Sequence, residues 1–170
     1  PPASSSAASD VYKRQVYDLD YVALRYFNVY GPRQRAGSPY AGVIANWAHS
    51  LMMQKPLVVY GNGKQSRDFI HVSDVVRANV KAIDVPTTGF TTYNICSEGK
   101  TSLNTILNHL RMITRYTFGI KYEEARKGEV KDSSGVNVRA RVGLEWEPAT
   151  NLYDGLESLL RWRGVECKNE

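Results

Sequence analysis

The sequence has 170 residues, of which 42% are hydrophobic and 23% charged, and its 22 Lys and Arg against 17 Asp and Glu give a formal net charge of +5. This composition excludes an intrinsically disordered chain, a collagen-like repeat and a small disulfide-built scaffold. The length suits either one compact unit or a piece of a larger domain, and we favour the piece.

Basic residues are scattered singly among acidic ones, which is typical of a solvated surface and not of a polybasic arm. The two cysteines, Cys96 and Cys167, are too far apart to build a disulfide framework or a Cys-x-x-Cys zinc site. We therefore expect a reducing, cytoplasmic location. No segment reaches the ~18–20 continuous apolar residues of a membrane helix, so no membrane partner is expected.

The first fifteen residues, PPASSSAASDVYKRQ, are small and polar, and a patterned sequence follows them. We interpret residues 1–15 as a leader, tag or joining artefact and residues 16–170 as the folded unit. Residues 21–27, YVALRYF, are rich in β-branched and aromatic side chains, which predicts a buried strand. This strand must end before Gly31-Pro32, because proline is not tolerated inside a sheet.

A helix and a hairpin are expected next. Apolar side chains recur at helical spacing over residues 40–53, and Lys55-Pro56 closes this helix. Residues 57–60 and 67–72 are short extended runs, and the Gly-Asn-Gly sequence at 61–63 is a strong turn signal between them. We therefore expect the two runs to pair as a small hairpin.

The following helix is expected to begin at Ser73, whose hydroxyl is a good N-cap, with the Asp74 charge meeting the helix dipole in the first turn. Four apolar residues should form its buried stripe, namely Val75, Val76, Val80 and Ile83.

The remainder alternates strands with helices. Residues 93–95 and 120–122 read as short strands, a polar loop follows at 123–134, and short helices are predicted at 138–144 and 152–162. Between the two strands, a helix opening at Thr101-Ser102 carries an apolar face made of Leu103, Ile106, Leu107, Leu110 and Ile113. This alternation predicts an α/β fold.

Three sequence clusters carry polar groups suited to a ligand. In residues 24–34, LRYFNVYGPRQ, an amide and a guanidinium follow a buried strand, and the carboxyl ends of strands are where ligands bind in open α/β sheets. An asparagine in an ordinary turn would explain this cluster equally well. In residues 126–129, RKGE, an arginine could meet a phosphate and the acid a ribose hydroxyl, although a solvated charged loop is an equal explanation.

The third cluster spans residues 57–72. Tyr60 offers a flat face for stacking a base, and Arg67 could fork onto a phosphate. The plain alternatives are cross-strand packing of Tyr60 and a surface ion pair of Arg67 with Asp68. Asp68, His71 and Asp74 do not predict a metal site, because they belong to different elements and a fourth ligand is not evident.

Taken in order, LRYFNVYGPRQ, VYGNGKQSRDFIHVSDVVRA, a Tyr-Asn-Ile strand, TSLNTIL, RKGEVKDSS and WEP closely resemble the C-terminal half of the extended short-chain dehydrogenase/reductases, in the NAD-dependent epimerase/dehydratase family. Within it, the sequence is most similar to nucleotide-sugar 4-epimerases of the UDP-glucose 4-epimerase type. The resemblance covers residues 16–164. It implies the substrate-binding portion of an extended Rossmann-type enzyme, with an incomplete parallel sheet and a small α/β subdomain.

The resemblance implies roles for individual residues. Tyr26 and Phe27 would face the nicotinamide end of NAD, and Asn28 would hydrogen-bond the substrate diphosphate. Towards the nucleoside and its phosphates, the residues implied are Val43 beside the base, Tyr60 stacked on uracil, Arg67 and Arg126 on phosphate oxygens, and Glu129 on the ribose.

Two family motifs are missing from the sequence. It has no Gly-x-x-Gly-x-x-Gly turn, and its one Tyr-x-x-x-Lys match, Tyr60 to Lys64, is interrupted by Gly-Asn-Gly. We therefore assign no catalytic residue to this chain and expect it to be inactive alone. Two local departures also occur, because Gly135-Val136 replaces a usual Ala-Asp and Glu145-Trp146 replaces a usual Gly-Trp.

The resemblance implies that the parent protein is a homodimeric 4-epimerase of UDP-glucose or UDP-N-acetylglucosamine, with NAD as cofactor. A dehydratase or decarboxylase of the same family is the nearest alternative. An inactive truncated fragment, with residues 21–27 left at an unpaired sheet edge, is another. A nucleic-acid-binding module, suggested by the positive charge and eleven tyrosines, is disfavoured because the aromatic residues fall mostly at buried-looking positions, so no nucleic-acid partner is expected.

Overall fold

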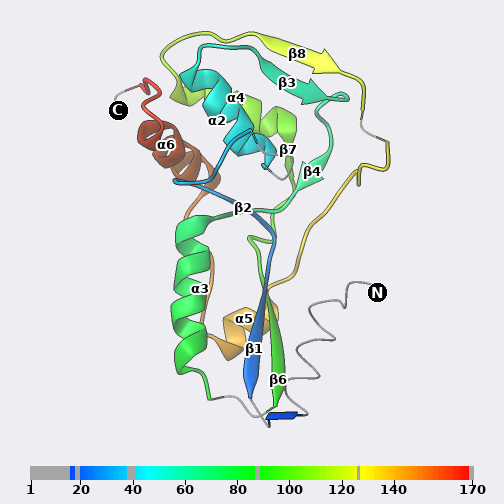
Figure 1. Cartoon of the computed structure of the whole chain (residues 1–170), viewed down its shortest axis with the longest axis vertical. Coiled ribbons are helices and arrows are strands. Elements are labelled where there is room, and N and C mark those ends of the chain that lie inside the picture. Colours follow the sequence, from blue (N-terminus) through cyan, green and yellow to red (C-terminus); the bar gives the residue numbers. More distant parts are fainter. Residues whose placement is uncertain (1–15, 18–19, 38–40, 87–88, 126, 169–170) are drawn as a thin grey trace.

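The computed structural model describes residues 16–17, 20–37, 41–86, 89–125 and 127–168. Its described elements form an elongated molecule with a lower and an upper region (Figure 1). The segment 1–15 and Arg126, both named in the sequence predictions, lie outside the described residues.

The lower region is a parallel strand pair with two helices. β1 (Tyr21–Tyr26) pairs in parallel with β6 (Phe90–Ile95), in register from Tyr21 opposite Phe90 to Tyr26 opposite Ile95. Helices α3 (Val72–Asp84) and α5 (Val138–Gly143) lie beside the strands (Figure 1). A buried cluster joins these elements and consists of Ile70, Val75, Ala78, Tyr93, Ile95, Ala140, Leu144 and Trp146.

The inward face of α3 differs from the predicted one. Val75 and Ala78 are buried, but the side chains of Val76, Val80 and Ile83 are 55%, 56% and 79% exposed. Both sets have helical spacing, so the sequence offers two apolar stripes, and the one carrying the small Ala78 packs closely on the strands. The predicted buried stripe is therefore wrong at three of its four positions.

The start of α3 also differs from the prediction. His71 is the N-cap, and its ring nitrogen Nδ1 accepts a hydrogen bond from the Ser73 amide at 3.3 Å. Asp74 lies in the first turn but is buried, and it accepts hydrogen bonds from the amides of Ala149 and Thr150. Its carboxylate therefore holds the backbone at Ala149 and Thr150 in addition to meeting the helix dipole.

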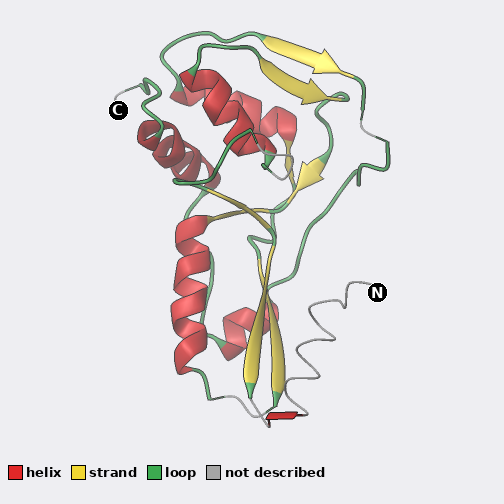
Figure 2. Ribbon diagram, viewed as in Figure 1, coloured by secondary structure: helices red, strands yellow, loops and turns green. Residues whose placement is uncertain are grey.

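The upper region packs three helices beneath a second parallel pair (Figure 2). β3 (Leu57–Tyr60) runs parallel to β8 (Ile120–Glu123), and the helices are α2 (Val43–Met52), α4 (Leu103–Ile113) and α6 (Leu152–Trp162). The predicted helices and the predicted apolar face of α4 are confirmed, because all five of its named residues are buried. The Trp47 indole donates a 2.7 Å hydrogen bond to the Val58 carbonyl and so ties α2 to β3.

Two further strand pairs connect the regions. β2 (Asn28–Tyr30) is parallel to β5 (Phe69–His71), and β4 (Ser66–Arg67) is antiparallel to β7 (Thr101–Ser102). The predicted hairpin is therefore wrong, since β3 pairs with β8 and β5 with β2. Glycine at position 63 instead allows the Asn104 side chain to approach closely, because a Cβ on Gly63 would lie only 2.2 Å from the Asn104 side-chain oxygen.

Within the described ranges, β1 pairs with β6 alone. Among the described residues, no helix is long and apolar enough to cross a membrane.

Glu145 adopts a left-handed backbone conformation, with φ of +49°. The Glu145→Gly substitution should raise the free energy of unfolding by about 0.5–1 kcal/mol, because glycine adopts this backbone conformation without the Cβ clash. The greater entropy of glycine in the unfolded chain offsets part of this stabilisation. Urea denaturation of both proteins measures the difference. Glu147→Gly is the matched control, since Glu147 is exposed and has no positive φ, and it should lower stability. A loss of stability in Glu145→Gly would contradict the argument.

Candidate nucleotide-binding cavity

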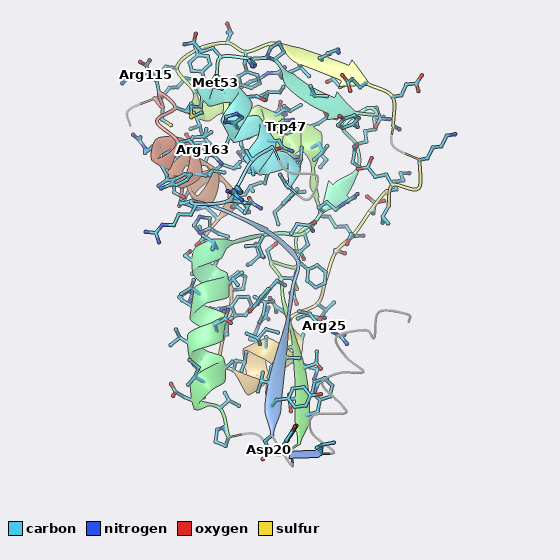
Figure 3. All side chains as sticks on the ribbon, in the orientation of Figure 1. Asp20, Arg25, Trp47, Met53, Arg115 and Arg163 are labelled. Carbon is cyan, nitrogen blue, oxygen red and sulfur yellow. The ribbon has the colours of Figure 1, made fainter. Side chains whose placement is uncertain are left out.

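A cavity of about 530 Å³ opens in the upper region where β2, α2, β3, β4, β5 and the connection after β8 meet. Five of the residues predicted for the site line it, namely Asn28, Val43, Tyr60, Arg67 and Glu129. The same wall includes polar residues that the sequence interpretation did not assign, namely Gln34, Asn46, Ser50 and Gln65. Trp47, labelled in Figure 3, also borders the cavity.

Asn28 is fixed at the first residue of β2. Its backbone amide and its side-chain amide nitrogen Nδ2 both donate to the carbonyl oxygen of Asp68, at 3.1 and 2.9 Å. The Asn28 side chain is half-buried, and its orientation is set by the Asp68 carbonyl, between β4 and β5. This arrangement leaves the rest of its amide group available to a ligand in the cavity.

Arg67 is held by three acceptors. Its guanidinium donates to the Ser66 carbonyl at 2.8 Å, to the Lys131 carbonyl at 3.3 Å and to the Glu129 carboxylate at 3.4 Å. The ion pair is partly buried, with 19% of the Arg67 and 29% of the Glu129 side chain exposed. The alternative ion pair of Arg67 with Asp68 is therefore wrong, because Asp68 is fully buried and binds other donors.

The cavity lining also includes apolar and aromatic side chains. Val43 opens α2, whose N-cap residue Gly42 provides no side-chain cap. Tyr60 ends β3 and is half-buried, and its carbonyl accepts a 2.7 Å hydrogen bond from the Gln65 side chain. A flat ring and a guanidinium in the lining of one cavity suit a ligand with an aromatic base and an anionic tail.

The predicted cofactor residues do not line this cavity. The Tyr26 ring is 46% exposed and its hydroxyl donates to the Asn79 side chain at 2.8 Å, in the lower region. Phe27 packs where a Cβ on Gly135 would lie 2.4 Å from its ring and 2.8 Å from the Cys96 sulfur. The glycine that replaces the family's usual alanine thus makes room for Phe27.

Asp68, His71 and Asp74, which we do not interpret as a metal site, make hydrogen bonds within the protein. Within the described ranges, no group of three or more His, Cys, Asp and Glu side chains could hold a metal ion. The carboxylates of Asp68 and Asp74 instead accept hydrogen bonds from backbone amides. Burial raises the pKa of the Cys96 thiol to about 11, so this cysteine is protonated at neutral pH.

His71 lies behind the cavity wall formed by Tyr30. The two rings meet edge-on with centroids 5.4 Å apart, and His71 Nε2 lies 3.2 Å from the Ser158 hydroxyl. Burial lowers the pKa of His71, and the nearby Asp74 offsets only part of this effect. Burial also raises the pKa of Tyr30 well above its ordinary value, helped by Asp74 and Asp154, so the phenol stays protonated.

Comparison with protein families matches residues 6–96 to the NAD dependent epimerase/dehydratase family, which is more than half of the chain. The chain belongs to the NAD-dependent epimerase/dehydratase family. The match begins within the segment 1–15 that we interpreted as a leader.

Individual relatives agree with this assignment. The crystal structure of UDP-glucose 4-epimerase from Thermotoga maritima with UDP-glucose superposes with a TM-score of 0.84 and 34% identity, covering 93% of this chain and 50% of that one. UDP-glucuronic acid 4-epimerase from Bacillus cereus, in complex with UDP-glucuronic acid and NAD, superposes with a TM-score of 0.83 and 28% identity. The match covers 94% of this chain and 49% of that one. A UDP-N-acetyl-alpha-D-glucosaminuronate decarboxylase from Bacillus cytotoxicus is 31% identical, covering 85% of this chain and 46% of the relative.

The chain thus spans about half the length of the curated relatives it matches. The predicted fold class is confirmed, since the described α/β elements superpose on Rossmann-type nucleotide-sugar epimerases. The family resemblance stated from the sequence motifs is confirmed as well.

The buried His71 makes stability depend on pH. Its Nδ1 accepts from the Ser73 amide, so the folded state favours the neutral ring, whereas the unfolded chain titrates near the ordinary value of 6.5. The unfolded state therefore binds more protons below this value, and the free energy of unfolding should fall as the pH drops from 7.5 to 5.5. Urea denaturation at both pH values measures the change. A His71→Gln variant should lose most of this dependence, and an unchanged dependence would contradict the assignment to His71.

Proposed function

We propose that the cavity binds the nucleoside diphosphate of a UDP-sugar, and that the whole protein is an NAD-dependent 4-epimerase of UDP-glucose or UDP-N-acetylglucosamine. The observation that supports this proposal is the meeting of Asn28, Tyr60 and Arg67, remote in sequence, on one cavity wall. Its volume lies within the range of cavities that enclose small-molecule ligands. Structures of relatives that contain UDP-glucose or UDP-glucuronic acid support the same ligand class.

Each residue would act on a different part of the ligand. The Tyr60 ring would stack on the base, with Val43 covering its edge. Arg67 would bind diphosphate oxygens through charge-assisted hydrogen bonds, and Asn28 would add a neutral donor. Glu129 would then have two effects, because it orients Arg67 in the free protein and can accept from a ribose hydroxyl once the phosphates engage the guanidinium.

Among the described residues, the two predicted to face NAD contact different neighbours. Tyr26 turns towards Asn79 while Phe27 turns towards Gly135 and Cys96, and the sequence has no glycine-rich Gly-x-x-Gly-x-x-Gly turn. We therefore propose NAD as the cofactor of the whole protein, bound mostly by residues other than these. The chain alone would bind the nucleotide without catalysis.

A decarboxylase or dehydratase is the second candidate. The decarboxylase from Bacillus cytotoxicus is about as similar to this chain as the epimerases are. Both activities would use the same nucleotide-binding wall, so the cavity does not separate them. Incubation of the whole protein with UDP-glucose and with UDP-glucuronic acid, followed by NMR of the sugar, distinguishes C4 inversion from loss of carbon dioxide.

Arg67→Ala should weaken UDP binding by the chain by about 10- to 150-fold, because a charge-assisted hydrogen bond contributes about 1.5–3 kcal/mol. The loss should fall near the upper end, since Glu129 would be left to repel the diphosphate. Isothermal titration calorimetry with UDP measures the dissociation constant. Arg139→Ala, an exposed arginine on α5 that does not line the cavity, is the control and should bind as the wild type does. Equal affinities of all three proteins would refute the proposed site.

Tyr60→Ala should weaken UDP binding by about 1–3 kcal/mol, the usual contribution of one base stacked on an aromatic ring. Tyr60→Phe keeps the ring and should keep most of the affinity. The same titration distinguishes stacking from a mere structural role of this position. A phenylalanine variant that binds as poorly as the alanine variant would argue against stacking.

A further inference from the structure

The carboxylate of Asp68 is fully buried beside the cavity without lining it. Its Oδ1 accepts from the Ser97 backbone amide at 2.7 Å and from the Ser97 hydroxyl at 2.8 Å, and its Oδ2 accepts from the Gly135 amide at 3.2 Å. None of these donors is charged, and within the described residues Asp68 makes no ion pair. A buried carboxylate is tolerated only while such donors stay in place, so Asp68 constrains both segments that supply them.

The two segments are remote in sequence and approach from different directions. Ser97 follows the end of β6, and Gly135 belongs to the long connection between β8 and α5. Asp68 itself lies between β4 and β5. One carboxylate thus joins the end of the lower strand pair, the connection and the strip of chain that carries Arg67.

The connection runs beside β4 before it reaches Gly135. The Ser66 amide donates to the Lys131 carbonyl at 2.9 Å, and the Ser133 amide donates to the Ser66 carbonyl at 3.1 Å. The Ser66 hydroxyl also donates to the Asp132 carboxylate at 2.6 Å. Residues 131–133 therefore behave like an added strand, and the Gly135 contact to Asp68 anchors their far end.

The near end of this added strand reaches the cavity. Glu129, two residues before Lys131, pairs with Arg67, and the Lys131 carbonyl accepts from the same guanidinium. On the other side, the carbonyl of Asp68 accepts both hydrogen bonds that orient Asn28. Asp68 therefore positions both polar groups that we assign to the diphosphate. Its backbone carbonyl orients Asn28, and its carboxylate acts on Arg67 through the connection.

We propose that Asp68 is a positioning residue for phosphate recognition. It acts through Arg67, Glu129 and Asn28 and does not touch the ligand. The inference rests on the proposed nucleotide function of the cavity. The Asp68 carboxylate would thus orient the phosphate-binding groups, whereas the sequence indicates Asp68 only as a neighbour of Arg67.

Asp74 provides a matched control for Asp68. It is also fully buried, and its carboxylate also accepts three hydrogen bonds, from the Arg77 guanidinium at 2.5 Å and from the amides of Ala149 and Thr150 at 3.1 and 3.2 Å. None of these partners lines the cavity. Asp68→Asn and Asp74→Asn therefore remove equal charges from equally buried positions, and they differ in what they position and in the ion pair that Asp74, unlike Asp68, makes with Arg77.

The test compares both variants with the wild-type chain in urea denaturation and in calorimetric titration with UDP. Both substitutions should lower stability, because an amide cannot accept from all three donors. Only Asp68→Asn should weaken UDP binding, by on the order of 10-fold, the effect of one displaced hydrogen bond. In an Arg67→Ala background this loss should shrink, since the two residues act on the same interaction. Equal losses of affinity in the two Asp variants would overturn the proposal.

Hydrogen exchange of the amides of residues 129–135 separates this proposal from the proposed function. Asp68→Asn should speed their exchange relative to Asp74→Asn, whether or not UDP binds. If the wild-type chain binds no UDP while this difference appears, the nucleotide function fails and the positioning effect stands. Unchanged exchange overturns the positioning effect. Should Asp68→Asn fail to fold, Ser97→Ala removes one of the three donors and should produce the same two effects to a smaller degree.

Discussion

The stretch from Ser66 to His71 carries the hydrogen bonds on which the arrangement of both regions depends. Its residues pair with β2, with β7 and with the connection after β8, and its buried carboxylate binds Ser97, just after β6. Six residues thus meet four remote segments at the narrow middle of the molecule (Figure 1). Because Arg67 lies in this stretch and Asn28 is hydrogen-bonded to it, the backbone pairing that joins the regions also builds one wall of the cavity.

Helices could be predicted from the sequence where one apolar face was unambiguous. The inward residues of α4 follow directly from their spacing. Spacing failed for α3, where Val76 and Val80 compete with Val75 and Ala78 and only the packed strands decide between them. It also failed for β3, since a nearby glycine turn indicates a hairpin, whereas the actual partner strand comes some sixty residues later.

The site was partly predictable for a different reason. Asn28, Tyr60, Arg67 and Glu129 were placed by the order of family motifs, and the structure does gather them at one cavity, although spacing alone left a plain explanation for each. The hydrogen bonds of Asp68 could not be predicted in this way. Its donors come from the segment after β6 and from an irregular connection, and no periodicity indicates where such segments pass.

The two buried clusters share no residue, and this separation has a consequence for how unfolding is observed. Trp47 belongs to the upper cluster and Trp146 to the lower one, and both side chains are almost fully buried. In variants that keep one of the three tryptophans at a time, Trp47 would report on the upper region and Trp146 on the lower one. A ligand in the cavity stabilises the cluster around Trp47 directly and reaches the other only through the narrow middle, so a single melting temperature need not describe this chain.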